Sequence, residues 1–192
     1  RYQTRFACIG SACEDTCCAG WTINVDEEHF HKMRAVLGET REGASLFDAN
    51  VKRVSIKPTK ERHALVVLNS SSGRCNFLDD RSLCKLQSRY GERVLPTVCA
   101  TYPRRQSVVH TTTEDRREMA LLLSCPEAAR LALLAKDAME LVDVDSAQPP
   151  REREQFVQWN DGSVLYDAAL DVVRSTLLAI MSGAPSLEGG LA

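Results

Sequence analysis

Eight cysteines in a chain of 192 residues constrain this sequence more than any other feature. Cys8, Cys13, Cys17 and Cys18 lie within eleven residues, whereas Cys75, Cys84, Cys99 and Cys125 are spread over 51 residues. A chain of this length can bury a hydrophobic core without disulfides, so the cysteines are not needed as covalent cross-links. In a reducing compartment, clustered cysteines indicate metal ligation or redox chemistry. We therefore expect a cytoplasmic protein with a cysteine-ligated metal centre.

The spacing of the cysteines distinguishes between kinds of metal centre. Zinc sites usually use paired hooks of two cysteines, and only Cys13 and Cys17 approach that spacing, without a matched pair downstream. Iron–sulfur clusters accept less regular spacings, so four thiolates from both groups could hold one. Neighbouring side chains diverge, so we expect Cys17 and Cys18 to have different roles. The spacing therefore argues against a simple zinc ribbon and is compatible with an iron–sulfur cluster.

Charge and hydropathy exclude several partners. The chain has 24 basic and 26 acidic residues, and this balance argues against a dedicated nucleic-acid binder. No apolar segment approaches the roughly 20 residues that span a bilayer, so we expect no membrane partner. Glycine-rich nucleotide-binding motifs are also missing from the sequence, which leaves a Rossmann-type methyltransferase or a P-loop enzyme unsupported.

Short strands and helices alternate along the first part of the chain. Apolar alternation predicts a strand at 20–25, and β-rich runs at 51–56 and 63–68 predict an antiparallel pair. A helix capped by Asp26 is expected between the first two strands, and residues 39–50 are expected to form a loop. A helix over 81–90 and two strands at 108–113 and 119–123 follow. The predicted fold class is α+β, arranged around the cysteine site.

Helical signals dominate the C-terminal part of the sequence. Ser124 and Glu127 have the spacing of a capping box, which predicts a helix running to about residue 142. Residues 143–160 contain two adjacent prolines and a charge run, and they predict a linker. A last amphipathic helix is expected at about 163–181. We therefore predict a cysteine-rich domain at 1–142, a linker at 143–160 and the start of a helical region at 161–192.

Basic side chains and histidines are weaker candidates for a site. Arg81, Lys85, Arg89 and Arg93 recur every fourth residue, as on one face of a helix, and Arg104 and Arg105 extend the stripe. Such a stripe is either a solvated helix face or a surface for an anionic ligand. None of the four histidines has a metal-ligand spacing with the cysteines.

Several short motifs together resemble the flagellin lysine N-methylase family. They are Phe6 to Gly10, Cys13 to Ile23, Cys75 to Asp79, Leu83-Cys84, Cys99 to Arg104 and Ser124 to Ala129. The resemblance extends over about residues 2–134. That family is related to a wider group of cysteine-rich domains described as zinc- or iron-chelating, and all eight cysteines fall on its cysteine positions.

The resemblance implies methylation of lysine side chains on flagellin, a protein of the bacterial flagellum. It implies S-adenosylmethionine as the methyl donor and a 4Fe-4S cluster, or zinc, held by cysteines from the set of eight. Arg104 or Arg105 could pair with the carboxylate of the donor, and no catalytic residue is assigned. Family members are about twice as long and continue into a second, mostly helical part. The alternative is a zinc- or iron-chelating module without enzyme activity.

Overall fold

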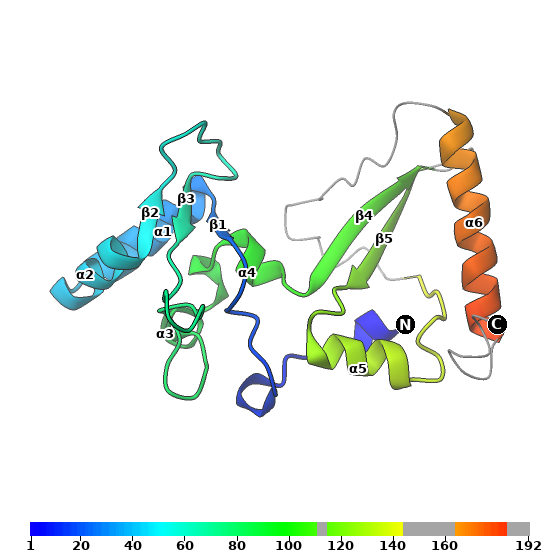
Figure 1. Cartoon of the computed structure of the whole chain (residues 1–192), viewed down its shortest axis with the longest axis horizontal. Helices are drawn as coiled ribbons and strands as arrows, with labels where there is room; N and C mark the ends of the chain where they lie inside the picture. Colours follow the sequence, from blue (N-terminus) through cyan, green and yellow to red (C-terminus); the bar gives the residue numbers. More distant parts are fainter. Residues whose placement is uncertain (111–114, 144–163, 184–192) are drawn as a thin grey trace. The chain divides into compact units, whose positions relative to one another are not determined.

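The computed structural model describes residues 1–110, 115–143 and 164–183, and its helices and strands are shown in Figure 1. The chain forms two compact units. Ile9–Tyr102 is the central unit, and Arg1–Cys8 together with Pro103–Ala192 is the terminal unit. Because residues 144–160 lie outside the described residues, the predicted division into 1–142, 143–160 and 161–192 stays a prediction.

A three-stranded antiparallel sheet supports the central unit. Its order is β1 (Ile23–Val25), β3 (Ala64–Val66) and β2 (Val51–Arg53). Val66 lies opposite both Ile23 and Val51, so the three side chains form one apolar row across the sheet, and all three are buried. The three predicted strands are confirmed, although each is only three residues long.

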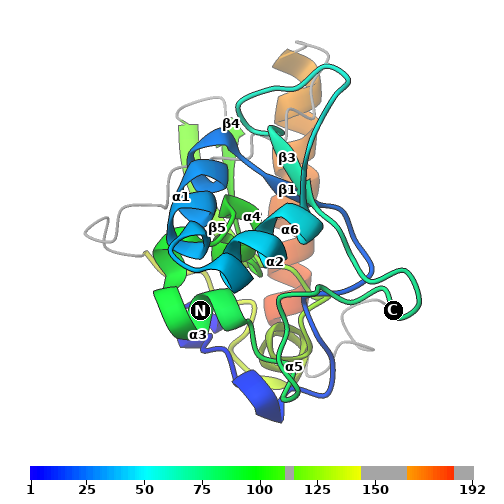
Figure 2. The same ribbon diagram turned by 90° about the vertical axis from the view of Figure 1, so that its left-hand side faces the viewer.

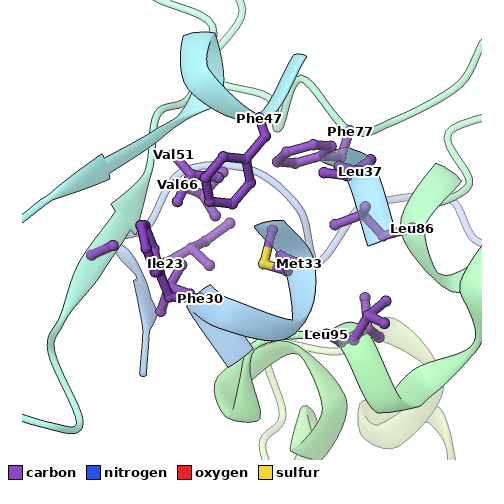
Figure 3. Packing of buried hydrophobic residues seen from close by; sticks show 13 residues of the cluster. Ile23, Phe30, Met33, Leu37, Phe47, Val51, Val66, Phe77, Leu86 and Leu95 are labelled. Atoms are coloured by element: carbon purple, nitrogen blue, oxygen red, sulfur yellow. The ribbon is translucent and has the colours of Figure 1, made fainter. Parts of the chain in front are cut away.

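Helix α1 (Glu27–Gly38) follows β1 as predicted. The Asp26 side chain caps it by accepting a hydrogen bond from the backbone N–H of His29. Phe30, Met33 and Leu37 recur on one face of the helix and are buried. The helix therefore contributes a continuous apolar stripe to the core, which Figure 3 shows from close by.

Helix α2 (Arg41–Asn50) occupies the segment for which a loop was predicted, and that prediction is wrong. The Thr40 side chain caps this helix by accepting from the backbone N–H of Gly43. Phe47 is buried and packs edge-on against Phe30 of α1, with ring centroids 5.2 Å apart. Packing against α1 (Figure 2) buries one face of α2, which carries Gly43, Phe47 and Asn50 at helical spacing.

Three short helical segments complete the central unit. They are α3 (Lys85–Tyr90), the 3-10 helix η3 (Glu92–Val94) and α4 (Thr97–Thr101). A further 3-10 turn, η2 (Gly10–Ala12), precedes the first strand. The predicted helix over 81–90 begins only at Lys85, because Ser82 adopts a positive φ of 63° and Asp79 holds a turn before it. The basic residues from Arg81 to Arg93 therefore do not share one helix.

The terminal unit contains the 3-10 turn η1 (Tyr2–Arg5), the hairpin of β4 (Arg104–His110) and β5 (Asp115–Leu121), and helices α5 (Pro126–Leu134) and α6 (Val164–Gly183). The Leu121 backbone N–H donates to the Tyr2 hydroxyl at 3.2 Å, and Arg5 pairs with Asp137. The two strands and the last helix are confirmed, with shifted ends. Helices and small antiparallel sheets together confirm the predicted α+β class.

The predicted capping box at the start of α5 is wrong. Pro126 is the first helical residue, so Cys125 rather than Ser124 is the N-cap, and no side chain caps the helix. The helix ends at Leu134, earlier than the predicted residue 142. Among the described residues, no helix combines the length and apolar character that crossing a bilayer requires.

A substitution at Gly43 tests the close packing between α1 and α2. It is buried, and a Cβ atom at this position would overlap the backbone carbonyl oxygen of Leu37 and lie 2.9 Å from Thr40 Oγ1. Gly43→Ala is therefore expected to lower the free energy of unfolding by about 1–3 kcal/mol in urea titrations. Gly38→Ala is the matched control, because a Cβ at Gly38 meets no atom within 4 Å. Equal stability of the two variants would contradict the packing.

Candidate functional site

Five of the eight cysteines line one cavity in the central unit, which we call the thiol pocket. They are Cys17, Cys18, Cys75, Cys84 and Cys99. Cys17 is exposed and the other four are half-buried. The cavity has a volume of about 70 Å³. Residues that are up to 82 positions apart in the sequence thus converge on a single small space.

Backbone hydrogen bonds join the loops that carry four of these cysteines. The N–H of Cys75 donates to the carbonyl oxygen of Cys18 at 2.7 Å, which ties the first cysteine loop to the segment after β3. Cys84 forms an isolated β-bridge with Leu78 and is the N-cap of α3. Local backbone pairing therefore fixes these positions without a long element of secondary structure.

Asp26 connects the cap of α1 to the helix that carries Cys99. Its Oδ2 accepts from the Thr97 backbone N–H at 3.2 Å and from Thr97 Oγ1 at 2.8 Å. Its Oδ1 accepts the backbone N–H of His29 at 3.2 Å and lies 2.7 Å from His29 Nδ1. Only 4% of Asp26 is exposed. One buried carboxylate thus joins the starts of α1 and α4, and α4 contributes Cys99 to the pocket.

The rest of the pocket lining is apolar or aromatic. Six of these residues also belong to the core of Figure 3. The lining residues other than cysteine are Trp21, Ile23, Met33, Val66, Phe77, Leu86, Gln87, Leu95, Pro96 and Tyr102. None of these described residues has a carboxylate, an imidazole or a basic group. The cysteine sulfurs therefore face a mostly apolar cavity whose other polar groups are the Gln87 amide, the Tyr102 hydroxyl and the Trp21 indole N–H.

Burial raises the pKa of most pocket thiols. It is the first cause for Cys75, Cys84 and Cys99, and neighbouring pocket sulfurs raise these three values further. Without a cation, these side chains are consequently neutral thiols at pH 7. A thiophilic cation would reverse the effect, because it stabilises the thiolates that burial and mutual repulsion disfavour.

Cys17 and Cys18 form a pair with opposite properties. Their sulfurs lie 3.9 Å apart, and the hydrogen bond between them lowers the pKa of Cys17 to about 7 and raises that of Cys18. The prediction that the two residues have different roles is consistent with these opposite shifts, although both line the pocket. Cys17 is the thiol of the pair that ionises first.

The other three predicted ligands are not among the lining residues of the thiol pocket. Cys8 and Cys125 belong to the terminal unit, where Cys125 is the N-cap of α5. Cys13 is the C-cap of η2 in the central unit and does not line the pocket. In the part of the chain that the structure describes, no three Cys, His, Asp or Glu side chains converge closely enough to hold a single metal ion as they stand.

Arg104 and Arg105, predicted to pair with a donor carboxylate, are in the terminal unit at the start of β4. The guanidinium of Arg104 lies over the ring of Phe6, 5.1 Å from its centroid, and Arg105 is half-buried opposite Ala120. Neither residue lines the thiol pocket. Their role stays a prediction.

Two features of the site were not predicted from the sequence. The Trp21 and Tyr102 rings lie together at the pocket, and no pattern in the sequence pairs these two residues. Asp26 was predicted only as a helix cap, and no pattern in the sequence relates it to Thr97, 71 positions away. A tryptophan that follows a cysteine cluster by three residues was the one available signal.

The fold and the pocket define a small α+β domain with convergent thiols. The chain belongs to the family described as "Putative zinc- or iron-chelating domain", whose model matches residues 7–126 and so includes all eight cysteines. The resemblance to that family is confirmed.

Curated relatives have names connected with methylation and the flagellum. A protein named Lysine-N-methylase from Salmonella typhimurium is 32% identical over 140 residues, which are 73% of this chain and 33% of the relative. Flagellar biosynthetic protein FliU from Salmonella muenchen is also 32% identical over 140 residues, or 73% of this chain and 78% of that protein. The match thus spans about a third of the lysine-N-methylase. No solved structure matches the chain.

Acid unfolding tests the role of Asp26. Burial raises its pKa, but hydrogen bonds from His29 and Thr97 outweigh burial and bring it from 3.8 to about 2. The folded pKa is the lower one, so the carboxylate stabilises the fold above pH 3.8, and this contribution disappears as the pH falls towards 2. Asp26→Asn is expected to reduce the free energy of unfolding at pH 7 by roughly 2 kcal/mol and to flatten its dependence between pH 4 and 2.

Chemical denaturation across that pH range provides the measurement. Thr97→Val, which removes one donor to Asp26, should give a smaller loss, and Thr97→Ser should preserve the wild-type curve. An unchanged acid dependence in Asp26→Asn would show that the carboxylate does not hold this junction.

Alkylation of the metal-free protein tests the cysteine pair. Iodoacetamide should modify Cys17 with a rate that is half-maximal near pH 7, because the hydrogen bond from Cys18 stabilises the Cys17 thiolate. In Cys18→Ala the midpoint should move up towards the ordinary thiol value of 9.0. Peptide mass spectrometry measures both rates. The same midpoint in the two proteins would exclude the proposed hydrogen bond.

Proposed function

We propose that the thiol pocket holds a 4Fe-4S cluster, with zinc as the alternative, through four thiolates from the set Cys17, Cys18, Cys75, Cys84 and Cys99. The observation that carries the proposal is the convergence of these five side chains on one apolar cavity. Thiolates are the ligands of iron–sulfur clusters and of structural zinc, and the lining offers no carboxylate for a hard cation such as Ca²⁺. The donor set therefore fits a thiophilic group in its chemistry.

A bound cluster or ion would supply positive charge that keeps the thiolates deprotonated and orders the loops that carry them. The chain's own contribution is exclusion of water. Met33, Phe77 and Leu86 are buried in the core and also line the pocket, so one wall of the site is a rigid apolar surface. Such a wall protects ligated sulfurs from oxidation and exchange.

We further propose that this chain is the cysteine-rich part of a lysine N-methyltransferase that acts on flagellin, with S-adenosylmethionine as donor. The names Lysine-N-methylase and flagellar biosynthetic protein of two relatives support the reaction and the substrate. A cytoplasmic location, where thiols stay reduced, agrees with this function. Arg104 and Arg105 are proposed to pair with the carboxylate of the donor.

Methyl transfer requires a neutral lysine amine. The lone pair of the lysine Nε forms a bond to the methyl carbon while the carbon–sulfur bond breaks, and its electron pair stays on the sulfur. The amine loses its proton to water before the attack. Desolvation in an apolar cavity lowers the pKa of a lysine, which favours the neutral form.

A metal-chelating module without enzyme activity is the second candidate. The family description names chelation alone, and the match spans about a third of the lysine-N-methylase. The two candidates differ in one respect, since both bind metal and only the methylase transfers a methyl group.

Purification without oxygen, followed by iron, sulfide and zinc analysis, tests the metal proposal. We expect about four irons and four sulfides per chain if the group is a cubane cluster, or zinc in a colourless protein. Cys75→Ser and Cys99→Ser should lose most of the metal. Cys8→Ser and Cys125→Ser are matched controls that should keep it, and metal loss in the controls would support all eight cysteines as ligands. Full metal content in every pocket variant would exclude the pocket as the site.

Transfer of radioactive methyl groups from S-adenosylmethionine to flagellin distinguishes the two candidates. Labelled flagellin with the wild-type chain, and a large decrease with Cys99→Ser, supports the methylase. Metal-loaded chain that does not label flagellin supports the chelating module instead.

A further inference from the structure

Positive charge is concentrated in the loop between β2 and β3 of the central unit. Residues 52–62, which we call the basic hairpin, contain one acidic residue and five basic ones, Lys52, Arg53, Lys57, Lys60 and Arg62. Figure 1 shows that this loop extends beyond the ends of the two strands. The basic hairpin has a formal net charge of +4, whereas the rest of the chain has one of −6. A chain that is otherwise acidic thus carries one strongly basic projection.

Three of the five cations lack a counter-ion among the described residues. Lys57, Lys60 and Arg62 are exposed, and none of them forms an ion pair in the described part of the chain. Arg53, in contrast, lies over the ring of Phe30, 4.9 Å from its centroid. Three like charges within six residues repel one another, and an anionic partner would relieve this repulsion. The outer part of the basic hairpin is therefore free to bind carboxylates.

Hydrogen bonds order the backbone of the basic hairpin. The N–H of Glu27 donates to the carbonyl oxygen of Lys60 at 2.8 Å, which ties the loop to the start of α1. The N–H of Arg62 donates to Thr59 Oγ1 at 3.1 Å, and Lys57 adopts a positive φ of 47° within the turn. The cations are thus presented on a preformed surface, so little conformational entropy is lost when a partner binds.

An apolar side chain lies among these cations. Ile56 is 76% exposed, although Val54 in the same loop is half-buried. An apolar residue surrounded by polar and charged ones is the composition of a small protein–protein contact. Single-stranded nucleic acids are bound by aromatic rings that stack on the bases, and residues 52–62 contain no aromatic residue. A loop that inserts into a membrane usually carries several apolar side chains rather than one. These features favour a protein as the partner.

We infer that the basic hairpin is a docking surface for an acidic segment of a partner protein. Carboxylates of that segment would pair with Lys57, Lys60 and Arg62, and an apolar side chain within it would cover Ile56. Complementary charge would select the partner and speed its association. The inference is independent of the proposed function, because it involves neither the pocket thiols nor a methyl donor.

Fluorescence anisotropy with the full chain tests the inference. The first probe is a fluorescein-labelled glutamate peptide with a central leucine, and the second has serine in place of the leucine. We expect the triple variant Lys57→Ala, Lys60→Ala, Arg62→Ala to bind the leucine probe about tenfold more weakly, because each exposed ion pair contributes a factor of a few. Ile56→Ser should weaken binding of the leucine probe alone.

A control variant separates the basic hairpin from the net charge of the chain. Arg41→Ala, Arg81→Ala and Arg93→Ala together remove the same charge from exposed positions outside the hairpin, and this protein should bind the leucine probe nearly as the wild type does. Circular dichroism verifies that all variants are folded. An equal loss of affinity in the control variant would show that net charge alone attracts the probe, and it would overturn the inference.

Other results would also contradict the docking surface. Equal binding of the leucine probe by the wild type and the triple variant would exclude the three cations as its site. Equal affinity of the wild type for the leucine and serine probes would exclude the apolar contact at Ile56. Phosphatidylserine vesicles and a single-stranded oligonucleotide serve as competing anionic ligands. Tighter binding of either one than of the leucine probe would overturn the inference of a protein partner.

Discussion

The carboxylate of Asp26 is the interaction on which the central unit depends most. A charge with 4% exposure is stable only when donors surround it, and His29 and Thr97 supply them from two different helices. The cap of α1 is thereby fixed to the start of α4. Because Cys99 lies two residues beyond Thr97, the same contact that satisfies a buried charge also sets where one pocket sulfur stands. The contact between Asp26 and Thr97 therefore stabilises the fold and also positions Cys99 in the thiol pocket.

The hydrophobic core and the thiol pocket share several residues. Met33 and Phe77 are among the most deeply buried side chains of the protein, and both line the pocket. A ligand that binds only the folded state stabilises it, so a metal held by the pocket thiols would couple its binding energy to the packing of this core.

Local sequence patterns predicted most of the helices and strands, whereas tertiary contacts determine which distant residues lie together. Asp26, Phe30 and Met33 follow the rules for a capped amphipathic helix, so α1 could be predicted. Residues 41–50 follow the same rules, with Thr40 as the N-cap and Phe47 on the buried face, and the prediction of a loop overlooked that pattern. The N-terminal cysteines were visible as a cluster. The downstream cysteines that line the pocket with Cys17 are positioned by β-bridges and backbone hydrogen bonds between distant loops. The spacing of the cysteines in the sequence does not predict those contacts.

The electrostatics of the pocket explain how a lining without charged side chains can bind a cation. Burial holds the thiols neutral until a soft cation arrives, so the pocket discriminates against hard cations by both ligand type and desolvation cost. Four thiolates around a divalent ion would leave a net negative charge, and the buried wall of Met33, Phe77 and Leu86 would limit the screening of that charge by water.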